Sequence, residues 1–149
     1  MGDIVSYEEV PASQVPLAKR LAAMEMKSFC TADLGLPYLK IIWAQKCGHT
    51  RQYSGQLFRN YVEAFGIAYL AEKIIMLNIE LLEYKVPHTA AHECRHFYQF
   101  KHMPDFPGNN DIEWDANRYA EQALKALHYW RCCQRSTAMS CTDKSLYIS

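Results

Sequence analysis

The sequence has no excess of charge of either sign, because 16 lysines and arginines balance 16 aspartates and glutamates in 149 residues. It therefore lacks the strongly basic surface typical of proteins that bind nucleic acids or anionic membranes, and we expect neither as a partner. No run approaches the roughly 20 apolar residues that a membrane-spanning helix requires. The N-terminus is acidic and has no long apolar stretch of the signal-peptide kind, so we expect a cytoplasmic protein.

The six cysteines lack the spacing that would give them a shared structural or redox role. No two of them form a CxxC pair, which excludes a zinc-finger framework or a thioredoxin-like motif built on such pairs. Reduced thiols are the expectation for a cytoplasmic protein. Among the residue types that bind metals, the six histidines therefore carry most of the functional information.

The composition is that of an ordinary globular domain, with half of the residues apolar and 21% charged. A length of 149 residues suits one compact domain, and we expect a single domain over residues 1–149. The apolar pattern predicts a helix over about 16–29, a loop over 31–37 and a strand over 38–44. Two short apolar runs, 66–71 and 73–77, predict paired strands that turn near Glu72.

The segment from 87 to 100 contains the pattern HExxH, at His92, Glu93 and His96. Two histidines four residues apart lie on the same face of a helix, so both imidazoles can reach one tetrahedral zinc ion. Glu93 lies about 100° around the helix from His92, where a carboxylate can act on a water without binding the metal. We therefore predict His92 and His96 as metal ligands and Glu93 as the general base. The opposite side of the helix carries an apolar stripe for packing: Ala90, Cys94 and Phe97.

Glu113 is the first candidate for a third ligand. In a helix, Glu113 falls within an apolar stripe that continues through Ala116, Ala120, Ala123, Leu124 and Leu127. A carboxylate on a core-facing surface is costly unless it is paired or bound to a metal. The small side chains of Ala116 and Ala120 allow close approach to the histidine helix, and Asn117 can orient an imidazole. The alternative is a glutamate in a first helical turn, stabilised there by the helix dipole.

His102 is the second candidate, because it follows His92 by ten residues, as the third histidine does in the metzincin pattern HExxHxxGxxH. Gln99 occupies the glycine position of that pattern, and glutamine adopts the required backbone bend less easily than glycine. We therefore favour Glu113 over His102. The plain alternative for His102 is a solvent-facing residue at a helix end.

On these residues the chain resembles a zincin metallopeptidase of the gluzincin type. More narrowly, the order Glu113, Ala116, Asn117, Tyr119 and Ala120 is similar to the glutamate helix of the ImmA/IrrE-type peptidases. The resemblance covers residues 87–127, and the sequence HECRH stands where that family usually has HELGH.

The resemblance implies an α+β fold of the minimal zincin type, with a small sheet packed on the HExxH helix and a following glutamate helix. It also implies a Zn²⁺ cofactor and a zinc metalloendopeptidase that cleaves a protein or peptide substrate, selective for an intracellular protein. The substrate would bind along an edge strand, 69–71 or 74–77, by β-augmentation. The metal-site core would cover 66–127, and the tail over 131–149 carries no informative pattern. Four residues are open candidates for stabilising an oxyanion: His88, Tyr98, Arg118 and Tyr119.

Two other interpretations stay open. One is a regulatory or interaction protein that keeps the zincin fold and the zinc ion with little or no proteolysis. The other is a helical interaction domain whose HExxH is coincidental and binds no metal.

Overall fold

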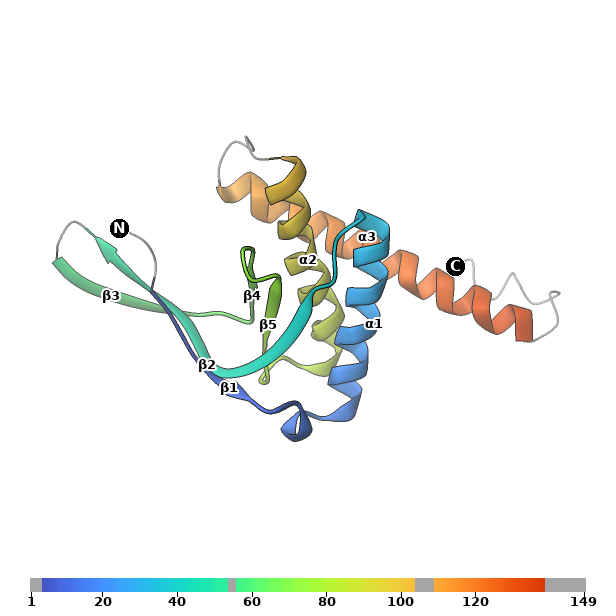
Figure 1. Ribbon diagram of the computed structural model, residues 1–149, viewed down its shortest axis with the longest axis horizontal. Helices are drawn as coiled ribbons and strands as arrows, with labels where there is room; N and C mark the ends of the chain where they lie inside the picture. Colours follow the sequence, from blue (N-terminus) through green and yellow to red (C-terminus); the bar gives the residue numbers. More distant parts are fainter. Residues whose placement is uncertain (1–3, 54–55, 104–108, 139–149) are drawn as a thin grey trace.

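The chain folds into a mixed sheet and three long helices, which confirms the α+β class (Figure 1). The computed structural model describes residues 4–53, 56–103 and 109–138. The strands are β1 (Ile4–Val10), β2 (Lys40–Tyr53), β3 (Gln56–Glu63), β4 (Gly66–Tyr69) and β5 (Ile74–Asn78). The helices are α1 (Leu17–Leu34), α2 (Val86–His102) and α3 (Asn109–Ala138), with short 3-10 turns at Ala12–Gln14 and Glu83–Lys85.

The long strand β2 organises the sheet. It pairs with β1 in antiparallel orientation along one side, and on its other side with β5 in parallel and then β3 in antiparallel orientation. The β2–β3 hairpin extends away from the helices (Figure 1). β4 pairs with β5 and lies at the edge of the strand order β1-β2-β5-β4. Of the two predicted edge strands, 74–77 is wrong, because it belongs to β5, which lies between β2 and β4. The other, 69–71, is right only at Tyr69, the last residue of β4, because 70–71 belong to the turn that follows.

The predicted strand pair is confirmed in β4 and β5, which run antiparallel with Ala68 opposite Ile75. The turn between them has no Asn-Gly sequence. Lys73 supplies the turn's left-handed conformation, with φ of 58°, which is uncommon for a residue with a side chain. The fully buried Asn78 joins the far end of this pair, since its side-chain amide donates to the Ala64 carbonyl at 3.1 Å and its oxygen accepts from the Glu80 N–H at 2.9 Å.

The first third of the chain is more regular than its sequence indicated. The helix predicted over 16–29 continues to Leu34, so 31–34 is its last turn and not part of a loop. Gly35 ends the helix in the left-handed conformation, with φ of 63°. The predicted strand over 38–44 is the first half of β2, which continues to Tyr53. β1 was not predicted.

The core lies between the sheet and the helices. The stripe predicted on α2 is confirmed, since Ala90, Cys94 and Phe97 are all buried. On α3, Ala116, Ala120, Ala123 and Leu127 are buried as expected, and Leu124 is partly buried. α3 also continues to Ala138, so residues 131–138 are helical, while 139–149 lie outside the described residues. None of the helices in the described ranges is both long and apolar enough to cross a membrane.

Candidate metal centre

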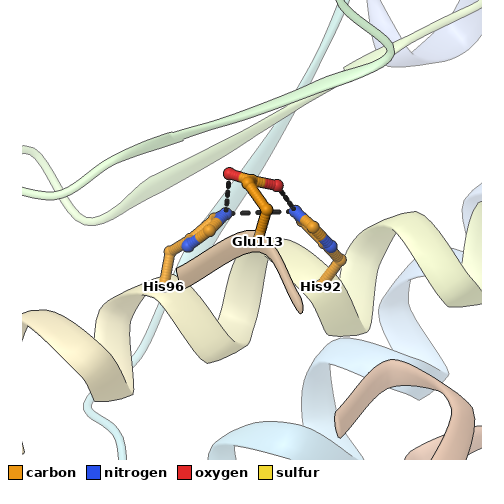
Figure 2. A group of neighbouring side chains, drawn as sticks. All are labelled: His92, His96 and Glu113. Atoms are coloured by element: carbon orange, nitrogen blue, oxygen red, sulfur yellow. Dashed lines mark hydrogen bonds and ion pairs between the residues drawn. The ribbon is translucent and has the colours of Figure 1, made fainter. Parts of the chain in front are cut away.

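Three side chains converge on one face of α2, and they are the three predicted metal ligands (Figure 2). His92 Nε2 lies 2.8 Å from Glu113 Oε2, and His96 Nε2 lies 3.3 Å from Glu113 Oε1. The two Nε2 atoms are 3.1 Å apart. The histidines come from adjacent turns of α2, and Glu113 reaches them from the beginning of α3. Among the described residues this is a His₂Glu group whose ligand atoms can hold a metal ion.

The donor set fits a tetrahedral cation. A zinc ion with bonds of about 2.1 Å separates its ligand atoms by about 3.4 Å, close to the spacing observed here. The Nδ1 atom of His92 lies 2.8 Å from Asn117 Oδ1, and that of His96 lies 2.8 Å from Gln99 Oε1. Because an amide oxygen only accepts, each Nδ1 carries a proton, and in the neutral imidazole each Nε2 then has a lone pair that can take up either a proton or a cation. Lone pairs and a carboxylate in contact repel one another unless a proton or a cation lies among them.

Glu113 is more exposed than the sequence indicated. The prediction of a core-facing carboxylate is wrong, since 56% of its side-chain surface is exposed. The buried stripe of α3 begins one turn later, at Ala116. The small side chains of Ala116 and Ala120 are fully buried and allow α3 to approach α2 closely. Glu113 therefore lies at the mouth of the site, where its contacts with the two imidazoles hold its carboxylate in place.

Glu113 and His96 shift each other's pKa in opposite directions. Hydrogen bonds with His92 and His96 hold the pKa of Glu113 well below its ordinary value. Burial lowers the pKa of His96, but the hydrogen bond with Glu113 and the charge of Glu93 outweigh it and raise the pKa above its ordinary value. In the metal-free protein the carboxylate is therefore ionised and attracts either a proton or a cation to the imidazoles.

Glu93 lies beside the cluster and is not one of its ligand atoms. Its carboxyl group is buried, with Oε2 at 3.9 Å from His92 Nε2. Burial raises the pKa of Glu93, although the charges of His96 and His92 act to lower it. The backbone N–H of Ala68 in β4 donates a hydrogen bond to the Glu93 carboxylate. A buried carboxylate with a raised pKa next to a metal site is suited to accepting a proton. Its role as a general base remains a prediction.

β4 approaches α2 closely at Gly66. A Cβ atom built there would lie 2.7 Å from Thr89 Cγ2 and 3.2 Å from Glu93 Cγ. Contacts under 3.0 Å are not tolerated without movement, so glycine allows the edge strand to lie directly against the helix that carries Glu93.

A cavity of about 430 Å³ opens beside Gly66, between β4 and the metal cluster. One side is formed by β4 residues 66–68, and the floor by the histidines and Glu93. The far end is apolar and is formed by Phe100, Met103 and Ile112. The edge strand, the predicted ligands and the predicted base thus share one cavity.

None of the four candidates for oxyanion stabilisation lines this cavity. The Tyr119 hydroxyl donates to Asp33 at 2.8 Å, and the Arg118 guanidinium lies over the Trp114 ring. Tyr98 stacks against the Arg95 guanidinium. His88 is half-buried and lies on α2 one turn before His92. Among the residues that form the cavity, the structure describes no tyrosine, arginine or lysine.

His102 does not join the cluster. α2 runs without a bend from Gln99 to His102, so His102 lies about 240° around the helix from His96. It is exposed, and its ring pairs with Tyr98 at a centroid distance of 4.7 Å. The metzincin-like alternative is wrong for this reason: without a glycine at position 99, the helix continues and carries the third histidine away from the other two.

Sequence reasoning missed two residues of the site. The sequence presents Gln99 only as an unsuitable residue at the glycine position of the metzincin pattern, but in the structure Gln99 hydrogen-bonds His96. Gly66 is predicted only as the first residue of a strand, but in the structure it allows β4 to lie against Glu93. The usable signals were a polar side chain three residues after His96 on the helix face that bears it, and a glycine in the strand before HExxH. Asn117, in contrast, was expected to orient an imidazole, and it contacts His92.

The sequence matches no protein-family model, no curated protein and no solved structure. The assignment to a class therefore depends on the site itself. What the site supports is a His₂Glu group able to hold a metal ion, with a buried carboxylate and the edge of a sheet beside it.

Proposed function

We propose that the protein is a zinc-dependent metallopeptidase. The observation that carries this proposal is the arrangement of Glu93, which lies next to the three ligand atoms without joining them and faces the cavity below β4. A His₂Glu ligand set that leaves one position open is typical of hydrolytic zinc sites. His92, His96 and Glu113 would hold the ion.

Zinc bound there supplies Lewis acidity and lowers the pKa of a water molecule toward about 7. Glu93 accepts the proton of the attacking water and passes it to the departing amine. Its raised pKa favours holding the proton between these two transfers. Asn117 and Gln99 hold the two imidazoles with Nε2 directed toward the ion.

The substrate in this proposal is a peptide segment in extended conformation. Among the described strands, β4 pairs only with β5, so its outer edge is open to a further strand. A peptide added to this edge passes over Glu93 and brings a carbonyl to the metal centre. The apolar end of the cavity at Phe100, Met103 and Ile112 favours an apolar side chain beside the scissile bond. We further propose that this substrate is one selected intracellular protein.

The test is the substitution Glu93→Gln in the zinc-loaded protein, assayed against a peptide library with product identification by mass spectrometry. We expect zinc to remain bound and cleavage to fall at least about 100-fold, because general-base catalysis contributes that much or more. The control is Glu80→Gln, which makes the same change at an exposed position. Equal cleavage by the Glu93→Gln protein and the wild type would contradict the proposal.

A second candidate function is a zinc-binding interaction protein with the same fold and little proteolysis. The observation that favours it is the absence of a phenol, guanidinium or amine among the described residues that form the cavity. A zinc-loaded wild type that cleaves nothing in the library, and whose zinc is lost on Glu113→Ala, would support this second function over the first.

A further inference from the structure

Gln99 is the buried polar side chain of α2 that the catalytic proposal does not require as a ligand or base. Only 4% of its surface is exposed, although glutamine is seldom buried. Its side chain makes three hydrogen bonds, to His96 Nδ1, to the Ile112 carbonyl and to Asp115 Oδ2, at 2.8, 2.9 and 2.8 Å. One residue of α2 thus joins a metal ligand of its own helix to the backbone and a side chain of α3.

The two contacts on α3 determine which way the amide points. The Ile112 carbonyl and the Asp115 carboxylate only accept hydrogen bonds, so the NH₂ group of Gln99 faces them. Arg95 holds Asp115 as a carboxylate by donating to it at 2.8 Å through Nε. The amide oxygen is then directed at His96, where it accepts a hydrogen bond from Nδ1–H. In the neutral imidazole this leaves Nε2 of His96 unprotonated and directed at the cluster, where it can bind an ion.

His92 has a corresponding partner in Asn117, but the two partners differ in exposure. Asn117 lies on the exposed surface of α3, where water competes for the Nδ1 proton of His92. Gln99 is shielded from water and has its amide held by two acceptors. Loss of a buried partner leaves a polar group without a hydrogen bond, whereas water replaces an exposed partner. The hydrogen bond to His96 is therefore the stronger determinant of ligand orientation.

We propose that Gln99 is the principal positioning residue of the metal centre: anchored by Ile112 and Asp115 on α3, it holds His96 in the tautomer that binds the ion. This inference rests on the metal-binding part of the proposed function and not on proteolysis. It predicts an asymmetry, since replacing the buried Gln99 weakens zinc binding more than replacing the exposed Asn117.

The experiment measures the dissociation constant for Zn²⁺ by competition with a chromophoric chelator, together with the melting temperature of the metal-free protein. Loss of an outer hydrogen-bond partner of a ligand weakens binding about 10- to 100-fold. We expect about 100-fold for Gln99→Met and about tenfold for Asn117→Leu. Gln122→Met is the matched control, because it makes the same change at an exposed glutamine of α3 and leaves zinc binding unchanged.

A rescue variant separates positioning from a merely structural role. Gln99→Glu combined with Asp115→Asn keeps an acceptor toward His96 but removes the donor to the Ile112 carbonyl. If Gln99 acts by accepting a hydrogen bond from Nδ1–H, the pair recovers at least about tenfold of the affinity lost in Gln99→Met, since a charged acceptor is stronger. The Nδ1–H resonance of zinc-loaded His96 is also protected from exchange in the wild type and the rescue variant. If Gln99 only anchors α3, affinity follows the melting temperature and the pair shows no recovery.

Three results would overturn the inference. They are zinc binding by Gln99→Met within about threefold of the wild type, a larger loss in Asn117→Leu than in Gln99→Met, and failure of the rescue pair. Wild type that binds no zinc would overturn both this inference and the metallopeptidase proposal. Wild type that binds zinc without cleaving peptides, and shows the asymmetry, would remove the peptidase and leave the role of Gln99 standing.

Discussion

Replacing Glu113 by alanine removes the only charged ligand of the candidate metal centre. Zinc-finger peptides with four ligands bind zinc with about 10–16 kcal/mol, or about 3 kcal/mol for each ligand. A loss of about 3 kcal/mol corresponds to about a 100-fold increase in the dissociation constant. Both carboxylate oxygens of Glu113 face imidazole nitrogens, at 2.8 and 3.3 Å, and alanine supplies no oxygen in their place. We therefore expect zinc affinity to fall at least about 100-fold.

Two control variants test the other interpretations of the same sequence. Asp111→Ala removes an acidic residue in the first turn of α3, where a carboxylate interacts with the helix dipole. It should lower the stability of the metal-free protein by less than about 1 kcal/mol and leave zinc binding unchanged. His102→Ala removes the histidine of the metzincin-like alternative and should also leave zinc binding unchanged. The assay is chelator competition, with thermal unfolding to verify that each variant is folded.

The result that would refute the reasoning is zinc affinity in Glu113→Ala within about threefold of the wild type, with the protein folded. Glu113 would then be a surface glutamate that merely attracts protonated histidines. Loss of zinc in His102→Ala would require a structure in which α2 ends before His102, contrary to the continuous helix seen here.

Three further predictions concern the surroundings of the site. Gly66→Ala should destabilise the protein by about 1–3 kcal/mol in urea unfolding, because its Cβ would meet Thr89 at 2.7 Å, and should reduce cleavage while zinc stays bound; unchanged stability would contradict this close approach. Asn78→Ala should cost about 3 kcal/mol by the same measurement, because it leaves the Ala64 carbonyl and the Glu80 N–H without their partner; a cost below about 1 kcal/mol would show that water replaces the amide. The metal-free protein should gain stability from the Glu113 and His96 pair between about pH 4.5 and 6.5. The lowered pKa of Glu113 stabilises the fold above its ordinary value of 4.5, and this contribution is lost as the pH falls through the folded pKa. The raised pKa of His96 stabilises the fold below its ordinary value of 6.5, and this contribution is lost as the pH rises through the folded pKa. Thermal unfolding against pH should show this window in the wild type and not in Glu113→Gln.

The ligand cluster was predictable because its geometry is mostly local. The spacing of His92 and His96 places both imidazoles on one face of any helix, and α2 is helical over the whole segment. The alanines of α3 predicted a close helix contact, and that contact carries Glu113 to the histidines. The exposure of Glu113 was not predictable, since it depends on where α3 begins relative to α2, which no periodicity encodes.

The sheet was predictable only where its strands are short and apolar. β4 and β5 are short apolar runs with a turn between them, whereas the second half of β2 is polar and has no period that indicates a strand. That half is held by backbone pairing with β1, which is far away in the sequence, and with β3 across a hairpin, and backbone pairing leaves no period in the residue pattern. The same limit applies to Gln99, whose role depends on two groups of α3 that are 13 and 16 residues away.

A single segment of α3 holds both histidines, directly or through Gln99. Glu113 contacts both Nε2 atoms, and Asn117 accepts a hydrogen bond from Nδ1 of His92. Ile112 and Asp115 hold the Gln99 amide, which accepts a hydrogen bond from Nδ1 of His96. Assembly of the metal centre and docking of α3 on α2 are therefore the same event. An ion that binds only the docked state stabilises it by about 2.7 kcal/mol at 100 times its dissociation constant. Zinc should consequently protect the backbone amides of the first turns of α3 from hydrogen exchange more than those of α1, whose packing on α2 involves none of these contacts.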